Sequence, residues 1–248
     1  MQTFKKIVLL FLVLFPFLSF TQKNINQQLA KEVYTSTITS ADAGTEKKRN
    51  ALVKMLNGML SIADEGDFKD RILDHKIYLD NLEYIKIPTA DLTKITDSLV
   101  GAYNLSFEKS GTEYYIEPDE SFRSVIKENN TGVYLYLFIN SEQKMYLEFV
   151  NYTDGVQKLN IYKSLIEVDN QKFPYYLNWV KSNSKTAEYC SIETNTTNFL
   201  ELFKAIAKHE NEFKITFIGE NGGRTQILPK EMAFEIKNIL NVYHKLIN

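Results

Sequence analysis

The segments Val133–Ile139 (VYLYLFI) and Lys144–Asn151 (KMYLEFVN) decide the fold class of this 248-residue chain. Both are rich in aromatic and β-branched residues, which favour an extended backbone. A short polar stretch separates them, and similar short runs continue along the chain. Sequential short strands joined by tight turns predict a mainly antiparallel sheet, either a curved sheet or a small sandwich.

Further extended segments of this composition lie on both sides of the first two. They are Glu113–Ile116, Leu159–Val168, Lys172–Leu177, Glu188–Glu193, Phe213–Ile218 and Thr225–Leu228. Turn-forming residues separate several of them, at Asp154-Gly155, at Asp169-Asn170 and across Glu220–Gly223. Such residues allow the backbone conformations that tight hairpins need, so neighbouring segments are predicted to pair.

The chain before residue 110 has a helical period instead. One apolar stripe, at spacings of three and four, consists of Leu52, Met55, Leu56, Met59, Leu60 and Ala63. This stripe predicts a helix over Thr45–Ala63. A second helix is predicted from Asp67, and a third from Pro88 with Thr89 as its N-cap. Further helices are predicted after Pro118, after Asn198 and after Pro229.

Together these patterns predict an α+β protein. A helical region, residues 22–110, precedes a β-rich α+β domain, residues 111–248, in which the C-terminal helix packs on the antiparallel sheet. No sequence repeat of about 20–50 residues recurs, which argues against a solenoid or propeller.

Residues 1–21 have the layout of a secretory signal peptide. A basic start precedes an apolar run from Ile7 to Phe15, and Ser19 and Thr21 are small residues at the positions that a signal peptidase reads. The run is shorter than the ~20 residues of a membrane-spanning helix. We therefore expect a mature chain from Gln22 that is periplasmic or secreted and is not an integral membrane protein.

Charge and cysteine content restrict the possible partners. Cleavage would remove Lys5 and Lys6 and no acid, so the 29 basic and 31 acidic residues become 27 and 31, a formal charge of −4. A mildly acidic chain has no electrostatic reason to bind nucleic acid or an anionic membrane surface.

Cys190 is the only cysteine, which excludes an internal disulfide, and it is expected to be a small buried hydrophobe.

The strong catalytic motifs are missing from the sequence. There is no phosphate-binding Gly-rich loop, no Gly-x-Ser-x-Gly elbow and no Cys-x-x-Cys. His75 lies on an apolar helix face and is predicted to be packed and hydrogen-bonded. Asp67, Asp70 and Asp74 share a helix face that could bind calcium, although acids near a helix start more often face solvent. We expect no metal and no cofactor.

Paired carboxylates are the basis of the alternative function. Two carboxylates about 5–10 Å apart could hydrolyse a sugar linkage, as in a secreted hydrolase of a glycan or peptidoglycan. Acids on or beside the predicted strands are Glu113, Glu117, Glu148, Glu167 and Asp169. A small-ligand carrier is a further alternative, with an apolar pocket of several hundred Å³ between the helical layer and the sheet.

Aromatic residues concentrate in the segment Phe173–Trp179. Exposed Tyr and Trp rings give rigid contact area for proteins or sugar rings, although the same rings could fill a sandwich core. The candidate binding residues are Tyr175, Tyr176 and Trp179, together with Arg224, which follows a glycine pair and could bind an anion. The favoured function is an exported, non-catalytic protein that binds a protein or glycan of the envelope or the extracellular space.

Overall fold

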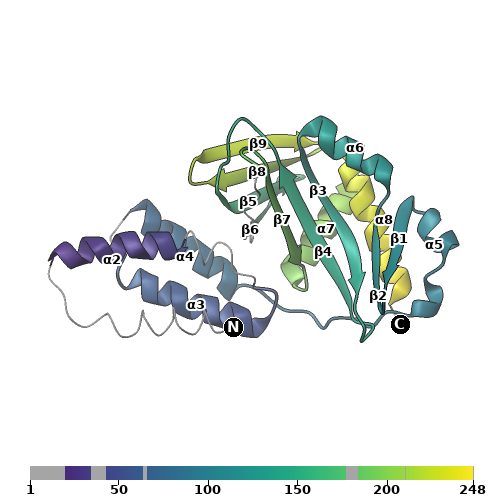
Figure 1. The fold of residues 1–248 in the computed structure, drawn as a ribbon, viewed down its shortest axis with the longest axis horizontal. Coiled ribbons are helices and arrows are strands. Elements are labelled where there is room, and N and C mark those ends of the chain that lie inside the picture. Colours follow the sequence, from purple (N-terminus) through teal and green to yellow (C-terminus); the bar gives the residue numbers. More distant parts are fainter. Residues whose placement is uncertain (1–19, 35–42, 64–65, 177–183, 210, 248) are drawn as a thin grey trace.

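A computed structural model of the chain describes residues 20–34, 43–63, 66–176, 184–209 and 211–247. A helical region lies at one end of the molecule, and a larger region with two sheets lies at the other (Figure 1). The predicted signal peptide up to residue 19 and the candidate Trp179 fall outside the described residues.

The described part of the helical region contains the helices α2 (Phe20–Val33), α3 (Glu46–Leu60) and α4 (Asp67–Asp80). The helices predicted from Thr45 and from Asp67 are confirmed. Thr45 is the N-cap of α3, and its hydroxyl accepts a hydrogen bond from the backbone N–H of Lys48 at 3.3 Å. The region has its own small core, made of Tyr34, Leu52, Leu56, Met59, Ala63, Ile72, Leu79 and Leu82.

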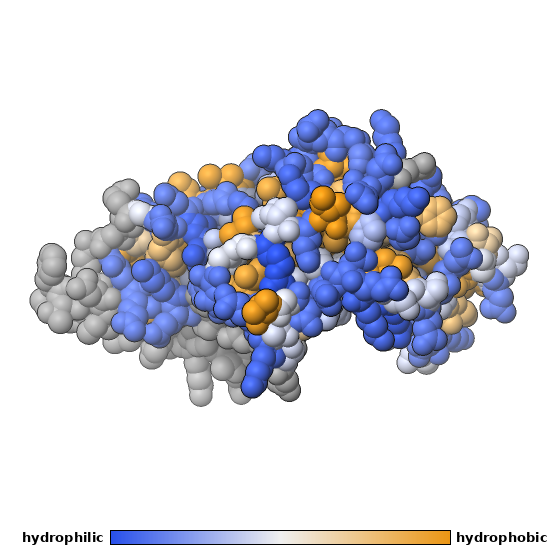
Figure 2. Space-filling model, turned by 90° about the horizontal axis from the view of Figure 1, so that it is seen from above, coloured by the Kyte–Doolittle hydropathy of each residue, from blue (hydrophilic) through white to orange (hydrophobic). Residues whose placement is uncertain are grey.

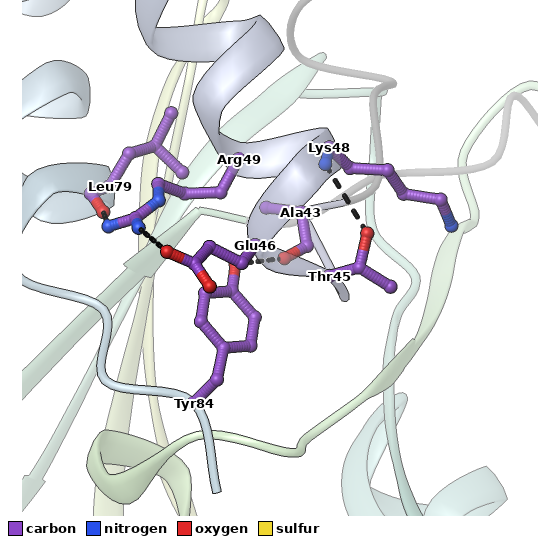
Figure 3. Close-up of polar contacts among 7 residues, drawn as sticks. All are labelled: Ala43, Thr45, Glu46, Lys48, Arg49, Leu79 and Tyr84. Carbon is purple, nitrogen blue, oxygen red and sulfur yellow. Dashed lines mark hydrogen bonds and ion pairs between the residues drawn. The ribbon is translucent and has the colours of Figure 1, made fainter.

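Polar contacts fix the start of α3 against the end of α4 (Figure 3). The Arg49 guanidinium donates to the backbone carbonyl of Leu79 at 3.4 Å and to the Glu46 carboxylate at 3.3 Å. The same guanidinium lies over the Tyr84 ring, whose hydroxyl donates to the carbonyl of Ala43. These bonds satisfy groups at helix ends, where backbone partners are lacking.

The larger region contains a five-stranded and a four-stranded sheet, and the strand pairs are antiparallel. The first has the order β1-β2-β3-β4-β7, with strands β1 (Leu105–Ser110), β2 (Glu113–Pro118), β3 (Thr131–Ile139), β4 (Met145–Thr153) and β7 (Glu188–Glu193). The second has the order β6-β5-β8-β9, with β5 (Ile161–Val168), β6 (Gln171–Tyr176), β8 (Phe213–Gly219) and β9 (Gly222–Leu228). The predicted α+β class with antiparallel sheets is confirmed.

Two local predictions were wrong. The segment from Pro88 forms no long helix; it contains a 3₁₀ turn η2 (Leu92–Lys94) and the short helix α5 (Asp97–Gly101), capped by Thr96 instead of Thr89. Tertiary hydrogen bonds hold it extended, because the N–H of Ala90 donates to the carbonyl of Gln143 at 2.9 Å. Asp154-Gly155 does not close a hairpin either, since β4 and β5 belong to different sheets.

Helices and the second sheet cover the inner face of the five-stranded sheet. The C-terminal helix α8 (Lys230–Leu246) packs against β2 and β3, and α7 (Thr197–His209) packs against α8 and β5. Both helices lie behind the sheet in Figure 1. The remaining helix, α6 (Glu120–Asn129), joins β2 to β3. One continuous core therefore includes α7, α8 and residues of both sheets.

Two buried polar contacts join the sheets. The Tyr175 hydroxyl on β6 donates to the side-chain oxygen of Asn151 on β4 at 2.8 Å. The Glu188 carboxylate on β7 accepts from the backbone N–H groups of Leu159 and Ile161 at 2.7 and 3.0 Å. A buried carboxylate is stable only when such donors replace water, so these bonds fix how the two sheets meet.

The helical region packs on the outer side of β5 and β6 through a polar aromatic cluster. His75 is 4% exposed, as predicted for a packed histidine, and its ring stacks on Tyr176 with centroids 3.9 Å apart. Its Nδ1 lies 3.2 Å from the Tyr34 hydroxyl. The neighbouring Asp74 pairs with Lys163 of β5 and accepts from the Tyr176 hydroxyl at 2.6 Å.

His75 makes this packing sensitive to acid. Burial lowers the pKa of His75 to about 3, against 6.5 for a free histidine, so the folded protein holds this ring neutral. The unfolded chain binds a proton below pH 6.5 that the folded chain does not bind. Stability is therefore full above pH 6.5 and is lost as the pH falls towards 3, by about 1.4 kcal/mol per pH unit.

We expect His75→Phe, which keeps a stacking ring but cannot titrate, to remove this part of the pH dependence. Urea unfolding at pH 6.5 and 5.5 measures it: the wild type should lose about 1 kcal/mol more than the variant, because this histidine is already half protonated at pH 6.5 in the unfolded chain. The exposed His244→Gln is the matched control and should behave like the wild type. Equal losses in wild type and His75→Phe would contradict the buried neutral histidine.

Candidate interaction surface

The outer face of the five-stranded sheet carries a layer of aromatic side chains. Alternate residues of β3 and β4 point inward and are buried, such as Leu135, Leu137 and Phe149. The residues between them point to the opposite side and are mostly half-buried. We call the aromatic residues on this side the tyrosine face: Tyr115, Tyr134, Tyr136, Phe138, Tyr146, Tyr152 and Tyr189.

Strand register places these rings next to one another. Tyr115, Phe138 and Tyr146 are direct neighbours across β2, β3 and β4, with ring centroids 5.2 and 5.9 Å apart. Tyr152 and Tyr189 are neighbours across β4 and β7. Such cross-strand aromatic contacts stabilise the sheet and hold each ring in place.

Hydroxyl and carboxylate groups accompany the rings. Burial raises the pKa of Tyr134 and of Tyr136 to about 12, so both hydroxyls stay protonated at neutral pH and can donate hydrogen bonds. The Tyr115 hydroxyl donates to Glu113 at 3.1 Å, and Ser191 donates to Glu148 at 3.0 Å. The face therefore offers rigid rings together with polar groups.

Helix α6 closes one end of the tyrosine face and forms a groove with it. Gly132 permits the close approach, because a Cβ atom there would lie 2.7 Å from the Ile126 side chain on α6. The groove has a volume of about 330 Å³, which lies in the range of ligand pockets. Aromatic residues of the sheet form its floor, and Arg123 and Lys127 of α6 line it together with Glu117.

The predicted binding residues lie elsewhere. Tyr175 is 2% exposed at the contact between the two sheets, and Tyr176 is 9% exposed under His75. The Arg224 guanidinium donates to the Thr153 hydroxyl and to the Asp154 carbonyl, both at 2.8 Å. These three side chains therefore hold parts of the fold together, and Trp179 lies outside the described residues.

Arg224 also explains why Asp154-Gly155 does not form the predicted hairpin turn. A Cβ atom on Gly155 would lie 1.9 Å from a nitrogen of the Arg224 guanidinium. The glycine lets the arginine reach the carbonyls of the segment between β4 and β5, including that of Gln157 at 3.3 Å. This segment crosses from one sheet to the other, and the anchor that redirects it comes from β9, far away in the sequence.

A second cavity of about 360 Å³ lies between α4, β6 and the start of α7. Tyr175 and Tyr176 line it together with the charged residues Asp74, Lys163 and Glu201. Burial alone would raise the pKa of Asp74, but hydrogen bonds from Lys163 and Tyr176 outweigh burial and lower it. An ionised Asp74 is a structural ion-pair partner and is unsuited to general acid catalysis at neutral pH.

Three of the five acids considered as hydrolytic groups lie next to basic side chains. Glu167 lies 2.6 Å from Lys214, Asp169 lies 2.7 Å from His209, and Glu117 lies 3.3 Å from Arg123. Among the described residues, no group of three or more His, Cys, Asp or Glu is placed to bind a metal ion. Within the same residues, no helix has the length and apolar character needed to cross a membrane.

Sequence reasoning missed the tyrosine face, although a signal for it was present. In Tyr134-Leu135-Tyr136-Leu137-Phe138, aliphatic residues alternate with aromatic ones. Both classes are apolar, so the segment looks like a fully buried strand, whereas period-2 alternation assigns each class to its own face.

Comparisons of the chain with protein-family models, with curated proteins and with solved structures found no match. The functional assignment therefore depends on the geometry of the site.

The two faces of β3 should differ in their contribution to stability. Leu137→Ala removes a fully buried side chain and should lower the free energy of unfolding by about 2–5 kcal/mol. Tyr136→Ala removes a half-buried cross-strand ring and should cost about 1 kcal/mol. Urea unfolding of both variants measures the difference, and equal losses would show that the tyrosine face is part of a second buried core.

Proposed function

We propose that this chain is an exported, non-catalytic protein that binds another protein of the cell envelope or the extracellular space through the tyrosine face. The observation that carries this proposal is the layer of half-buried aromatic rings on the outer side of the sheet. The inner face of the sheet already forms the core together with α8 and the second sheet. The fold therefore does not need a second aromatic layer for packing.

Rigid aromatic side chains are well suited to binding. A Tyr ring contributes a large contact area and loses little conformational entropy on binding, and its hydroxyl can form a hydrogen bond with the partner. Tyr, Trp and Arg are accordingly enriched at the centres of protein interfaces. The tyrosine face also holds its rings in fixed positions, since neighbours such as Tyr115 and Phe138 pack against each other. Pre-ordered side chains reduce the entropic cost of association.

The groove beside α6 supports the same proposal. Interfaces are commonly anchored by a few side chains that fill well-packed pockets. The groove has an aromatic floor and Arg123 on its α6 side, which suits an apolar anchor with a polar group at its rim. Export is part of the proposal because of the N-terminal layout, a basic start followed by an apolar run and small residues.

One observation favours a second candidate function, a small-ligand carrier. The cavity between α4 and β6 lies where such a carrier would bind its ligand, between the helical region and a sheet. Its lining includes Asp74, Lys163 and Glu201, so the ligand would be polar and not the apolar molecule first expected. Ligand binding would not involve the tyrosine face.

Site-specific photo-crosslinking tests the proposed function. A photo-reactive phenylalanine analogue replaces Tyr189, which is 39% exposed on the tyrosine face, in the full chain expressed in its source cells. We expect one predominant protein adduct, because the analogue would lie within the interface. The matched control places the analogue at Ile227, which is 66% exposed on β9 of the second sheet, and should give no such adduct.

Four outcomes would contradict the proposal. The same adduct from Tyr189 and Ile227 would indicate contact without a defined surface. A protein adduct from Ile227 alone would place the interface on the second sheet. Failure of both positions to form an adduct, with the chain folded and exported, would exclude a stable protein partner in those cells, and an adduct with a glycan would change the class of partner.

A further inference from the structure

We infer that the partner of the tyrosine face presents a cationic polypeptide surface, with Arg or Lys side chains that lie against the rings and the glutamates between them. This inference rests on the proposed function and specifies the chemistry of the partner.

Glutamates occupy outer-face positions between the rings. Glu108 on β1 is the direct neighbour of Tyr115, and Glu117 on β2 is the neighbour of Ser106. Glu148 on β4 is the neighbour of Tyr136. Glu113 belongs to the same face, where it accepts a hydrogen bond from Tyr115. These acids come from three different strands, and only the folded sheet brings them onto one surface.

Within the described strands β1, β2, β3, β4 and β7, no Lys or Arg occupies an outer-face position. Lysine is otherwise frequent in this chain, which has 29 basic residues in total. Lys109, the lysine of β1, has the opposite parity to Glu108 and lies over the ring of Tyr114. Negative charge on this face is therefore not balanced by cations from its own strands.

Positive charge lies next to this face at the end that α6 covers, whereas Lys144, just before β4 at the opposite end, donates to the Thr89 hydroxyl at 3.3 Å. Arg123 on α6 lies 3.3 Å from Glu117 and remains well exposed, and Lys127 lines the groove beside it. The glutamates farther from α6, such as Glu113 and Glu108, have no such basic neighbour on the outer face of the described strands. The face is thus divided into a cationic groove and an acidic, aromatic area.

The physics of the acidic area favours a cation over other partner groups. The face of an aromatic ring attracts cations through its quadrupole, and a carboxylate beside the ring adds direct attraction. Arginine suits such a site best, because its planar guanidinium stacks on rings and forms paired hydrogen bonds with carboxylates. An anionic partner surface would instead meet carboxylates of like charge.

Fluorescence anisotropy with two labelled peptides tests the inference on the full mature chain. One peptide alternates Arg and Ser, and the other alternates Glu and Ser at the same length. We expect the Arg peptide to bind at least tenfold more tightly at 0.1 M salt, where the Debye length is about 10 Å, and to lose most of this preference at 1 M, where it is about 3 Å.

Matched variants locate the binding site. Glu113→Gln with Glu148→Gln removes two carboxylates from the tyrosine face but keeps their shape and hydrogen-bonding groups, and should weaken Arg-peptide binding about tenfold. The control, Glu212→Gln with Glu231→Gln, removes the same charge from exposed positions outside this face and should change binding less than twofold. Tyr136→Ser should also weaken binding, because the rings contribute alongside the charges.

Equal affinity for the two peptides, or equal losses in the two double variants, would overturn the inference. Circular dichroism and the melting temperature of each variant establish that the fold is unchanged. Failure here is distinct from failure of the proposed function: a protein adduct at Tyr189 whose partner binds independently of charge would leave the surface assigned and remove the cationic partner alone.

Discussion

The period-2 alternation of β3 and β4 is the constraint on which the rest of the structure depends. Val133, Leu135 and Leu137 point inward with Phe149, and α8, α7 and the second sheet pack over them to form one core. A shift of one residue in register would exchange the two faces and bury the tyrosines in their place. The outer aromatic layer is thus a consequence of the register that builds the core, and it faces away from that core.

The second sheet connects this core to the helical region by using both of its faces at β6. Tyr175 points to the core and bonds to Asn151, whereas the next residue, Tyr176, points outward and stacks on His75. Two adjacent residues of β6 therefore contact the core on one face of the strand and the helical region on the other.

The surface seen from above is mostly hydrophilic, with hydrophobic residues in small groups (Figure 2). Glutamates lie among the rings of the tyrosine face, and no Lys or Arg of the described strands of this sheet shares that face.

Much of the fold could be predicted from local patterns, because strong periodicity and turn chemistry act over short distances. One example is the helix from Thr45. Another is the hairpin at Asp169-Asn170, whose two turn residues both have positive φ. Local patterns failed where distant groups compete, as at Pro88, held extended by the β3–β4 hairpin, and at Gly155, positioned by Arg224. The candidate Tyr175 and Tyr176 were selected for aromatic density, which does not distinguish a core from a surface. The tyrosine face required the register of neighbouring strands, which depends on the pairing of the whole sheet.

Hydroxyl-radical footprinting of the free mature protein, with mass spectrometry of the oxidised residues, tests most directly whether the tyrosine face is open to solvent. Phe138 and Tyr146 on the outer face should be oxidised several-fold faster than Phe149 and Phe203, which are buried on the inner side. Equal protection of all four rings would show that another part of the chain covers the face, and would contradict both its role as a binding surface and the partner chemistry inferred from it.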